Sequence, residues 1–181
     1  MKQTVLQNVL STLNSETPPQ KFSRKKKHID LSNILTEKKE DIRKYYTFHE
    51  SIGKGTQGKV FKAIRKLTNQ LCAIKLMKKN QSFTEKSLEF KILRKLDHPN
   101  IGKIIEFFNY QGNFYLVLKY YAFGDLKSNI IKKGFIPEQS TKNAMFQVLS
   151  AISYLQRHDC IHSDLQPQNI LIGGNTNDYD H

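Results

Sequence analysis

The sequence predicts an α+β fold in which five strands and one helix come first and further helices follow. Up to residue 121, the globular part mixes β-branched, aromatic and polar residues between glycine-containing turns, as strands do. After Gly124, apolar residues recur at helical spacing. With 38% apolar residues, 11 Phe and 8 Tyr, the chain can bury a core, which argues against wholesale disorder.

Residues 1–45 differ from the rest and are predicted to form a basic flexible tail. They contain Pro18-Pro19 and 10 Lys/Arg against 5 Asp/Glu, a net charge of +5 (10 − 5). A short helix is expected within residues 32–46. The basic run at residues 21–28 could be a nuclear signal, a polyanion contact or a solvated charge cluster.

The strands are predicted in a consecutive series that begins at Tyr46. They cover residues 46–55, 58–66 and 70–79, with two more inside residues 101–121 that are joined by a turn at 111–113. The last strand contains FYLVL, a nearly continuous apolar run, so it is expected to be buried on both faces.

Three helices are predicted, one between the strands and two after them. Leu88, Ile92 and Leu96 recur at helical spacing within residues 84–96, and Pro99 discourages continuation of that helix. A short helix is expected over residues 125–134, where Gly134 ends it. The third helix, residues 137–159, is expected to gather its larger side chains on one apolar face, namely Met145, Val148, Leu149, Ile152 and Leu155.

Charge and cysteine content bound the class of protein without selecting a function. A net charge of +13 suits nucleic acid, acidic membranes or phosphate-bearing ligands alike. The two cysteines, Cys72 and Cys160, lie in apolar segments and are expected to be buried thiols in a reducing compartment. No apolar run approaches the ~20 residues of a membrane span. We therefore expect a soluble cytoplasmic protein, or a nuclear one if residues 24–28 act as a signal.

A glycine-rich stretch follows the first strand of the globular part. Gly53, Gly55 and Gly58 have the spacing G-x-G-x-x-G, with Val60 two residues on. Glycines at this spacing let a backbone approach phosphates and offer them N–H groups. A plain glycine-rich hairpin explains the spacing about as well. A dinucleotide-binding turn is set aside, because a strand-like segment and not a helix follows.

Lys75 lies in the apolar strand CAIK, 22 residues after Gly53. Such a lysine either extends out of the sheet into solvent or points inward to neutralise phosphate oxygens. A buried ammonium needs a carboxylate partner. Glu89 in the predicted helix is the candidate, and Glu85 one turn earlier is the alternative.

Taken together, the segments IGKGTQGKVFKA, CAIK, EFKILRKLDHPNI, FYLVLKYYAFGDL and IHSDLQPQN resemble a protein kinase in order and spacing. The resemblance covers residues 46–181. Pro167 after Asp164 favours the serine/threonine branch, and the look of the first strands favours the calcium- and calmodulin-dependent group, although the sequence holds no calcium-binding loop.

The resemblance implies a fold and a domain organisation. The fold is the kinase N-lobe, a five-stranded antiparallel sheet with one helix, followed by the first helices of an incomplete C-lobe. The N-lobe covers residues 46–118, the hinge 119–124 and the start of the C-lobe 125–181.

The resemblance also implies roles for single residues, with ATP and Mg²⁺ as cofactors. The glycines cover the phosphates, Lys75 holds them and pairs with Glu89, Asp164 accepts the substrate proton, and Asn169 binds magnesium. The residues that it assigns to the nucleotide are Ile52, Gly53, Gly55, Gly58, Val60, Ala73, Lys75, Leu118, Lys119, Tyr121 and Asp125, with Tyr120 also in the hinge.

Several positions depart from the kinase pattern. Ser163 replaces an arginine that an activation-loop phosphate would need, and Lys119 occupies a place that is often acidic. Gln166 replaces a lysine that contacts the transferring phosphate; comparable donors are worth ~2.7–4 kcal/mol in the transition state. Gln57 and Gln156 are further departures.

After Asn169 the sequence contains no D-F-G, and Asp178 and Asp180 are interpreted as part of a polar loop. Three functions follow as expectations. The first is a serine/threonine kinase, of which this chain is an N-terminal portion that is inactive alone. The second is a non-catalytic kinase-like module that binds nucleotide or a partner kinase. The third, a nucleic-acid binder, rests on charge alone. Self-association through exposed C-lobe helices is also expected.

Overall fold

The computed structural model describes residues 3–4, 11–13, 37–55, 58–78 and 95–173. The chain divides into two compact units, here called the sheet unit and the helical unit. The sheet unit comprises Leu35–Asp97 and Gly102–Tyr120, and the helical unit comprises Met1–Ile34, His98–Ile101 and Tyr121–His181. The division after Tyr120 falls within residues 119–124, the segment predicted as the hinge.

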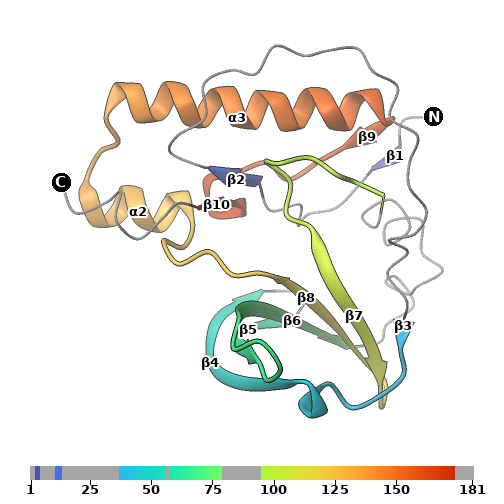
Figure 1. Cartoon of the computed structure of the whole chain (residues 1–181). Helices are drawn as coiled ribbons and strands as arrows, with labels where there is room; N and C mark the ends of the chain where they lie inside the picture. Colours follow the sequence, from blue (N-terminus) through green and yellow to red (C-terminus); the bar gives the residue numbers. More distant parts are fainter. Residues whose placement is uncertain (1–2, 5–10, 14–36, 56–57, 79–94, 174–181) are drawn as a thin grey trace. The chain divides into compact units, whose positions relative to one another are not determined.

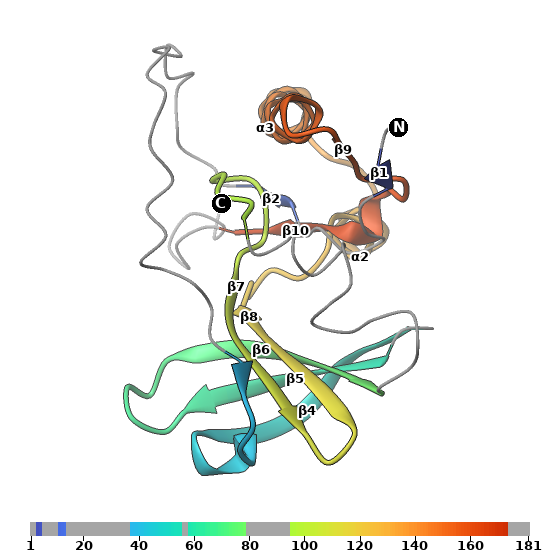
Figure 2. The ribbon, with the colours of Figure 1, turned by 90° about the vertical axis from the view of Figure 1, so that its right-hand side faces the viewer.

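The sheet unit contains a six-stranded sheet in the order β3-β7-β8-β6-β5-β4 (Figures 1 and 2). The strands are β3 (Glu37–Lys38), β4 (Tyr46–Gly55), β5 (Gly58–Arg65), β6 (Leu71–Lys78), β7 (Ile104–Tyr110) and β8 (Asn113–Lys119). The five strands from β4 to β8 pair antiparallel, and β3 adds to the edge of β7 in parallel. The predicted five-stranded sheet is therefore confirmed, with one strand added. The predicted helix at residues 84–96 lies largely outside the described residues.

Strand alternation gives this sheet two different faces. One face carries a buried aromatic and aliphatic cluster made of Ile42, Tyr46, Ala63, Cys72, Ile74, Phe108, Tyr115 and Val117. Because neighbouring residues of a strand point to opposite faces, the residues that alternate with this cluster face the other way. Four consecutive residues of β8, from Phe114 to Val117, are buried, as expected for a strand covered on both faces.

Residues 37–45 belong to the sheet unit, whereas from the sequence they are predicted to lie in the flexible tail. A 3₁₀ helix, η2 (Ile42–Lys44), begins after Asp41, whose side chain accepts a hydrogen bond from the Arg43 N–H at 2.9 Å. Ile42 is only 1% exposed and packs in the core cluster. Burial of this apolar side chain explains why the segment holds to the sheet despite its charged composition.

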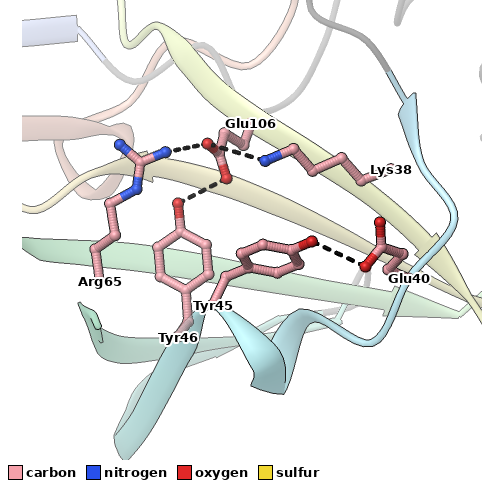
Figure 3. A network of polar contacts seen from close by, with 6 residues as sticks. All are labelled: Lys38, Glu40, Tyr45, Tyr46, Arg65 and Glu106. Atoms are coloured by element: carbon pink, nitrogen blue, oxygen red, sulfur yellow. Dashed lines mark hydrogen bonds and ion pairs between the residues drawn. The ribbon is translucent and has the colours of Figure 1, made fainter. Parts of the chain in front are cut away.

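A polar network centred on Glu106 joins this segment to β5 and β7 (Figure 3). The Glu106 carboxylate accepts a hydrogen bond from the Tyr46 hydroxyl at 2.8 Å and pairs with Lys38 at 3.4 Å and with Arg65. Burial and the neighbouring carboxylate raise the pKa of Tyr46 well above its ordinary value. Nearby, the Tyr45 hydroxyl donates to Glu40 at 2.8 Å. The network therefore fixes residues 38–46 to two strands of the sheet.

In the described residues of the helical unit there are two α-helices and several short strands. They are α2 (Leu126–Lys133), α3 (Glu138–Arg157), β9 (Cys160–Ile161), the 3₁₀ helix η3 (Pro167–Asn169), β10 (Ile170–Ile172), β1 (Gln3–Thr4) and β2 (Ser11–Leu13). The strands of the amino-terminal segment pair in parallel, β1 with β9 and β2 with β10 (Figure 1). Gly134 ends α2 with a positive φ of 79°, as predicted.

The third predicted helix forms, but its apolar residues divide between two faces. Val148 and Leu155 are 3% exposed and are buried with Ala144 and Ala151. Met145 and Leu149, predicted on the same face, are 49% and 57% exposed, as is Phe146 at 50%. The prediction of one apolar face is corrected, because a stripe that wide spans more of the helix than β2, β9 and β10 cover.

Cys72 and Cys160 are both free and buried, in agreement with the sequence-based expectation. Burial raises the pKa of the Cys72 thiol to about 11. None of the helices in the described part of the chain has the length and apolarity needed to cross a bilayer.

Candidate functional site

The predicted nucleotide-binding residues of the sheet unit meet on one face through strand register. Lys75 of β6 lies opposite Val60 of β5, which in turn lies opposite Gly53 of β4. On its other side Lys75 lies opposite Leu116 of β8. Directly opposed residues in antiparallel strands present their side chains on the same face. Residues 53, 60 and 75 therefore form a row across three strands.

A second row on this face lies two residues along β6. Ala73 lies opposite Leu118 of β8, and both share the face of Lys75, because side chains two apart in a strand point the same way. This face is opposite the one that packs Cys72 and Ile74 into the aromatic cluster. The result is a face on which the apolar side chains of Val60, Ala73 and Leu118 lie beside the buried Lys75. The more exposed Lys62, opposite Ala73, shares this face.

Of the two glycines of the G-x-G-x-x-G stretch whose surroundings the structure describes, Gly53 and Gly58, only Gly58 is required by its surroundings. It has a φ of +144°, and a Cβ at this position would lie 2.0 Å from the Leu76 carbonyl oxygen. Gly53, in contrast, leaves a Cβ at an ordinary 3.7 Å from Val60. Gly58 therefore lets β5 start directly against β6. Ile52, at an irregularity in the pairing of β4 with β5, is 45% exposed. Gln57 lies outside the described residues.

Lys75 is only 9% exposed, which is unusual for an ammonium group. Of the two predictions, burial excludes a side chain that simply extends into solvent. Glu89 and Glu85, its candidate partners, lie outside the described residues, so the predicted ion pair stays a prediction.

The predicted hinge residues divide between the two units. Lys119 ends β8 and is exposed, and the Tyr120 ring lies 5.7 Å from the Lys62 ammonium. Tyr121 begins the helical part, where its carbonyl accepts from the Gly124 N–H at 3.3 Å. Asp125 caps α2, accepting from the Ser128 N–H at 2.8 Å and the Ser128 hydroxyl at 2.6 Å. Its predicted role toward ribose stays a prediction.

The loop between β9 and β10 carries the predicted catalytic aspartate. Ser163 has a positive φ of 53°, and the turn brings the Asp164 N–H to 2.7 Å from the His162 carbonyl oxygen. The same N–H lies 3.3 Å from Nδ1 of His162, whose ring is buried. A left-handed serine is strained, so the contacts around it must hold the turn. The turn leaves Asp164 part-exposed.

Two amide side chains hold the Asp164 carboxylate. Asn169 donates from Nδ2 to Oδ2 at 3.0 Å and to the Asp164 carbonyl oxygen at 2.8 Å. Gln166 donates from Nε2 to Oδ1 at 2.8 Å. Because the Asn169 nitrogen makes both of its bonds to Asp164, its amide oxygen is the atom able to bind a cation.

The residues able to act as metal ligands can be compared with the predicted magnesium site. In the part of the chain that the structure describes, no three His, Cys, Asp or Glu side chains gather to hold a metal. Magnesium in nucleotide sites takes one or two protein ligands and completes its shell with phosphates and water. Asn169, the predicted magnesium ligand, fits that sparser kind of site through its amide oxygen. Asp178 and Asp180 lie outside the described residues.

Sequence reasoning missed a polar contact between residues 98–100 and α3. His98 Nε2 lies 3.1 Å from the Ser150 hydroxyl, and the buried Asn100 donates from Nδ2 to Gln147 at 2.8 Å. These residues lie in DHPN, which was used to end a helix and to support the kinase resemblance, but not to predict a contact with α3. The Glu106 network was also missed, since its members are up to 68 residues apart (106 − 38) and follow no motif.

Comparisons with known proteins agree with this geometry. Residues 46–179 match the model of the protein kinase domain. The chain is 36% identical over 158 residues to calcium-dependent protein kinase 5 of Plasmodium berghei (strain Anka), covering 83% of this chain and 28% of that protein. It is 38% identical over 129 residues to calcium-dependent protein kinase 5 of Plasmodium falciparum (isolate 3D7), covering 70% and 23%.

The chain thus spans about a quarter of the length of these two relatives. The family match covers well over half of this chain, including every strand from β4 to β8 and the loop that holds Asp164. This chain belongs to the protein kinase family.

Proposed function

We propose that this chain is the nucleotide-binding and catalytic-loop portion of a serine/threonine kinase that transfers the γ-phosphate of ATP to protein hydroxyls. The observation that carries the proposal is the buried Lys75, set in an apolar sheet face between Val60 and Leu116. An ammonium group held in such a face can neutralise phosphate oxygens in addition to any contact that it makes within the chain. A face that combines apolar contacts with one such cation suits a purine nucleotide.

The sheet unit supplies binding. Val60, Ala73 and Leu118 pack on the purine ring and remove it from water. Lys75 neutralises phosphate oxygens, and the glycine-rich stretch offers them backbone N–H donors. ATP, when bound, supplies the phosphoryl group. These residues orient it and shield it from water.

The helical unit supplies the acid–base group. Asp164 accepts the proton of the substrate hydroxyl at a carboxylate oxygen, and its contacts to Asn169 and Gln166 hold it in place. Asn169 would hold Mg²⁺ through its amide oxygen, and the ion would supply neutralisation of phosphate charge.

The serine/threonine branch is supported by Pro167 after the catalytic aspartate and by the two relatives, whose names describe calcium-dependent protein kinases. We extend the branch, and not the calcium dependence, to this chain. The two free, buried thiols support a cytoplasmic location, with the nucleus as the alternative.

Nucleotide binding is tested by thermal unfolding with and without Mg-ATP. Saturation near 100 times Kd should raise the Tm by roughly 5–10 °C. Lys75→Met should abolish the shift. Lys59→Met is the matched control. Lys59 is exposed on β5, and it points away from the face that Val60 shares with Lys75. A shift that persists in Lys75→Met would refute the assigned site.

A non-catalytic nucleotide-binding module is the second candidate. Ser163 and Gln166 favour it, because both stand where kinases carry a cation. A peptide-phosphorylation assay of the 181-residue chain separates the two. We expect little or no transfer by this chain alone, and robust magnesium-dependent transfer would contradict that expectation.

The exposed side chains of α3 support an additional proposal, association with a second copy or with a partner kinase. Met145, Phe146 and Leu149 are each about half exposed and lie close together on one side of the helix. Sedimentation of the purified chain tests self-association. A monodisperse monomer at high concentration would count against it, whereas Leu149→Lys should dissolve any oligomer.

A further inference from the structure

The side chain of Gln166 already donates a hydrogen bond within the chain, to the carboxylate of Asp164. A residue whose role is to bind the transferring phosphate would not need this bond. Gln166 Nε2 donates to Oδ1 of Asp164 at 2.8 Å, while Asn169 donates to Oδ2 at 3.0 Å. Each carboxylate oxygen therefore accepts from a different neutral amide. Both bonds to a charged acceptor are of the stronger, charge-assisted kind.

The backbone explains why these two donors converge. Gln166 precedes Pro167 and is extended, with φ −152° and ψ 158°, as a residue before proline should be. The 3₁₀ turn that follows brings the Asn169 N–H to 2.8 Å from the Gln166 carbonyl oxygen. The extended backbone at Gln166 and the tight turn after it therefore place the Gln166 and Asn169 side chains against different oxygens of the Asp164 carboxylate.

Removing either donor would free the carboxylate to rotate about χ1 and χ2. A carboxylate that accepts from two fixed donors is restricted to one orientation, which leaves its remaining lone pairs aimed in a constant direction. A general base must meet the hydroxyl at about 2.6–3.2 Å, so this restriction matters for proton transfer.

We propose that Gln166 is a positioning residue that fixes the Asp164 carboxylate, rather than a substitute ligand for the transferring phosphate. The proposal rests on the proposed function for its catalytic meaning. A neutral amide cannot supply the charge of the lysine found at this place in other kinases, but it can supply a donor to the base. Gln166 therefore acts on the reaction through Asp164.

The first experiment measures the orientation of Asp164 directly and needs no nucleotide. In the labelled 181-residue chain, three-bond couplings from Asp164 Cγ to its backbone nitrogen and carbonyl carbon report the χ1 rotamer by NMR. The native chain should show one rotamer. Gln166→Ala should show averaged couplings with a Tm within about 2 °C of native, because a side-chain contact is lost while the 3₁₀ turn remains.

Rescue and control variants separate positioning from a merely structural role. Gln166→Lys keeps a donor and should restore the single rotamer, whereas Gln166→Glu removes the donor at equal size and should not. Gln156→Ala changes an exposed glutamine on α3 and should leave the couplings unchanged. Native couplings in Gln166→Ala, or averaging that Gln166→Lys fails to restore, would overturn the proposal.

A second experiment tests the catalytic consequence. Little transfer is expected from this chain alone, so the measurement is made on whatever residual Mg-ATP-dependent transfer to a serine peptide the native chain shows. In Gln166→Ala the kcat of that residual transfer should fall by about 10- to 100-fold with the KM for ATP within twofold, as loss of orientation predicts. A rise in KM for ATP at unchanged kcat would instead mark a phosphate ligand and overturn the proposal. If the native chain transfers no phosphate, the hypothesis that this chain is catalytic by itself is refuted. The NMR couplings then decide whether Gln166 positions Asp164.

Discussion

The two units build their candidate sites in opposite ways. In the sheet unit, Gly53, Val60 and Lys75 come from three strands and meet only because register aligns them. In the helical unit, Asp164, Gln166 and Asn169 lie within six residues and meet through side-chain hydrogen bonds. A site made by register depends on the integrity of the whole sheet, whereas a site made within one loop depends on a few local bonds. Substitutions in the sheet should therefore cost more stability.

The largest effect is expected at Gly58. Gly58→Ala places a Cβ 2.0 Å from the Leu76 carbonyl oxygen and also strains the backbone, so β5 must move away from β6. We expect a loss of about 3 kcal/mol or more in the free energy of unfolding, measured by urea denaturation.

Gly134→Ala is the matched control for this substitution. Gly134 also has a positive φ, but nothing lies within 4 Å of its Cβ position. It should lose only about 1 kcal/mol. Equal losses in the free energy of unfolding at the two glycines would show that the close approach of β5 to β6 does not depend on Gly58.

Glu106 should give the second-largest effect. Glu106→Gln keeps the shape of the side chain but removes the charge that Arg65 and Lys38 share, in a position that is 13% exposed. The expected loss is about 2 kcal/mol, since hydrogen bonds to charged groups are worth about 1.5–3 kcal/mol.

The comparison for Glu106 is an exposed ion pair on α3. Glu138 pairs with Lys142 at 2.6 Å, but both side chains are more than 60% exposed. Glu138→Gln should therefore change the free energy of unfolding, measured by urea denaturation, by less than about 0.5 kcal/mol. If Glu106→Gln proved equally mild, the network would not be what attaches residues 38–46 to the sheet.

What could be predicted from the sequence follows the same division. The strands and the turn before Asn113 were readable, because alternation and a glycine mark them locally. The clustering of Asp164, Gln166 and Asn169 was easier to anticipate, because these residues are near one another in the chain, while their catalytic role stays a prediction. The Glu106 network and the sixth strand were not, because they join residues that are distant in the chain. Ile42, one apolar residue in a charged run, gave no periodic signal.

A single apolar face on α3 was predicted wrongly for a related reason. Apolar spacing shows which residues can be buried, but not how wide the covering elements are. Ile170 and Ile172 of β10 pack on Val148, and nothing in the pattern of α3 indicates that Leu149 remains 57% exposed. The roles of the nucleotide-binding residues stay predictions for the experiments above.

A smaller effect is expected at the cap of α2. Asp125→Ala removes the acceptor for the Ser128 N–H and should lose about 1 kcal/mol in urea denaturation. Asp125→Asn should lose far less, because asparagine caps helices as well as aspartate does. A Mg-ATP thermal shift reduced in Asp125→Asn would then report on the ribose and not on the helix.

The smallest effect should follow removal of residues 1–13, whose strands β1 and β2 pair with the two strands that flank the loop holding Asp164. The N–H groups of Ile170 and Ile172 already bond within the unit, to the carbonyl oxygens of Pro167 and Gly124. Because successive N–H groups of a strand point to opposite edges, the Leu171 N–H is the one directed toward β2.

Amide hydrogen exchange at the neighbouring residues Leu171 and Ile172 can therefore report on the two edges of β10 separately. Shortening the chain to residues 14–181 should speed exchange at Leu171 by about tenfold and leave Ile172 within twofold, as expected for the loss of a short edge pairing. Equal acceleration at both amides would mean that the amino-terminal strands stabilise the loop as a whole. Unchanged exchange at both would mean that the pairing with β2 does not protect β10 in solution, so that the loop holding Asp164 keeps its conformation through contacts within residues 124–172.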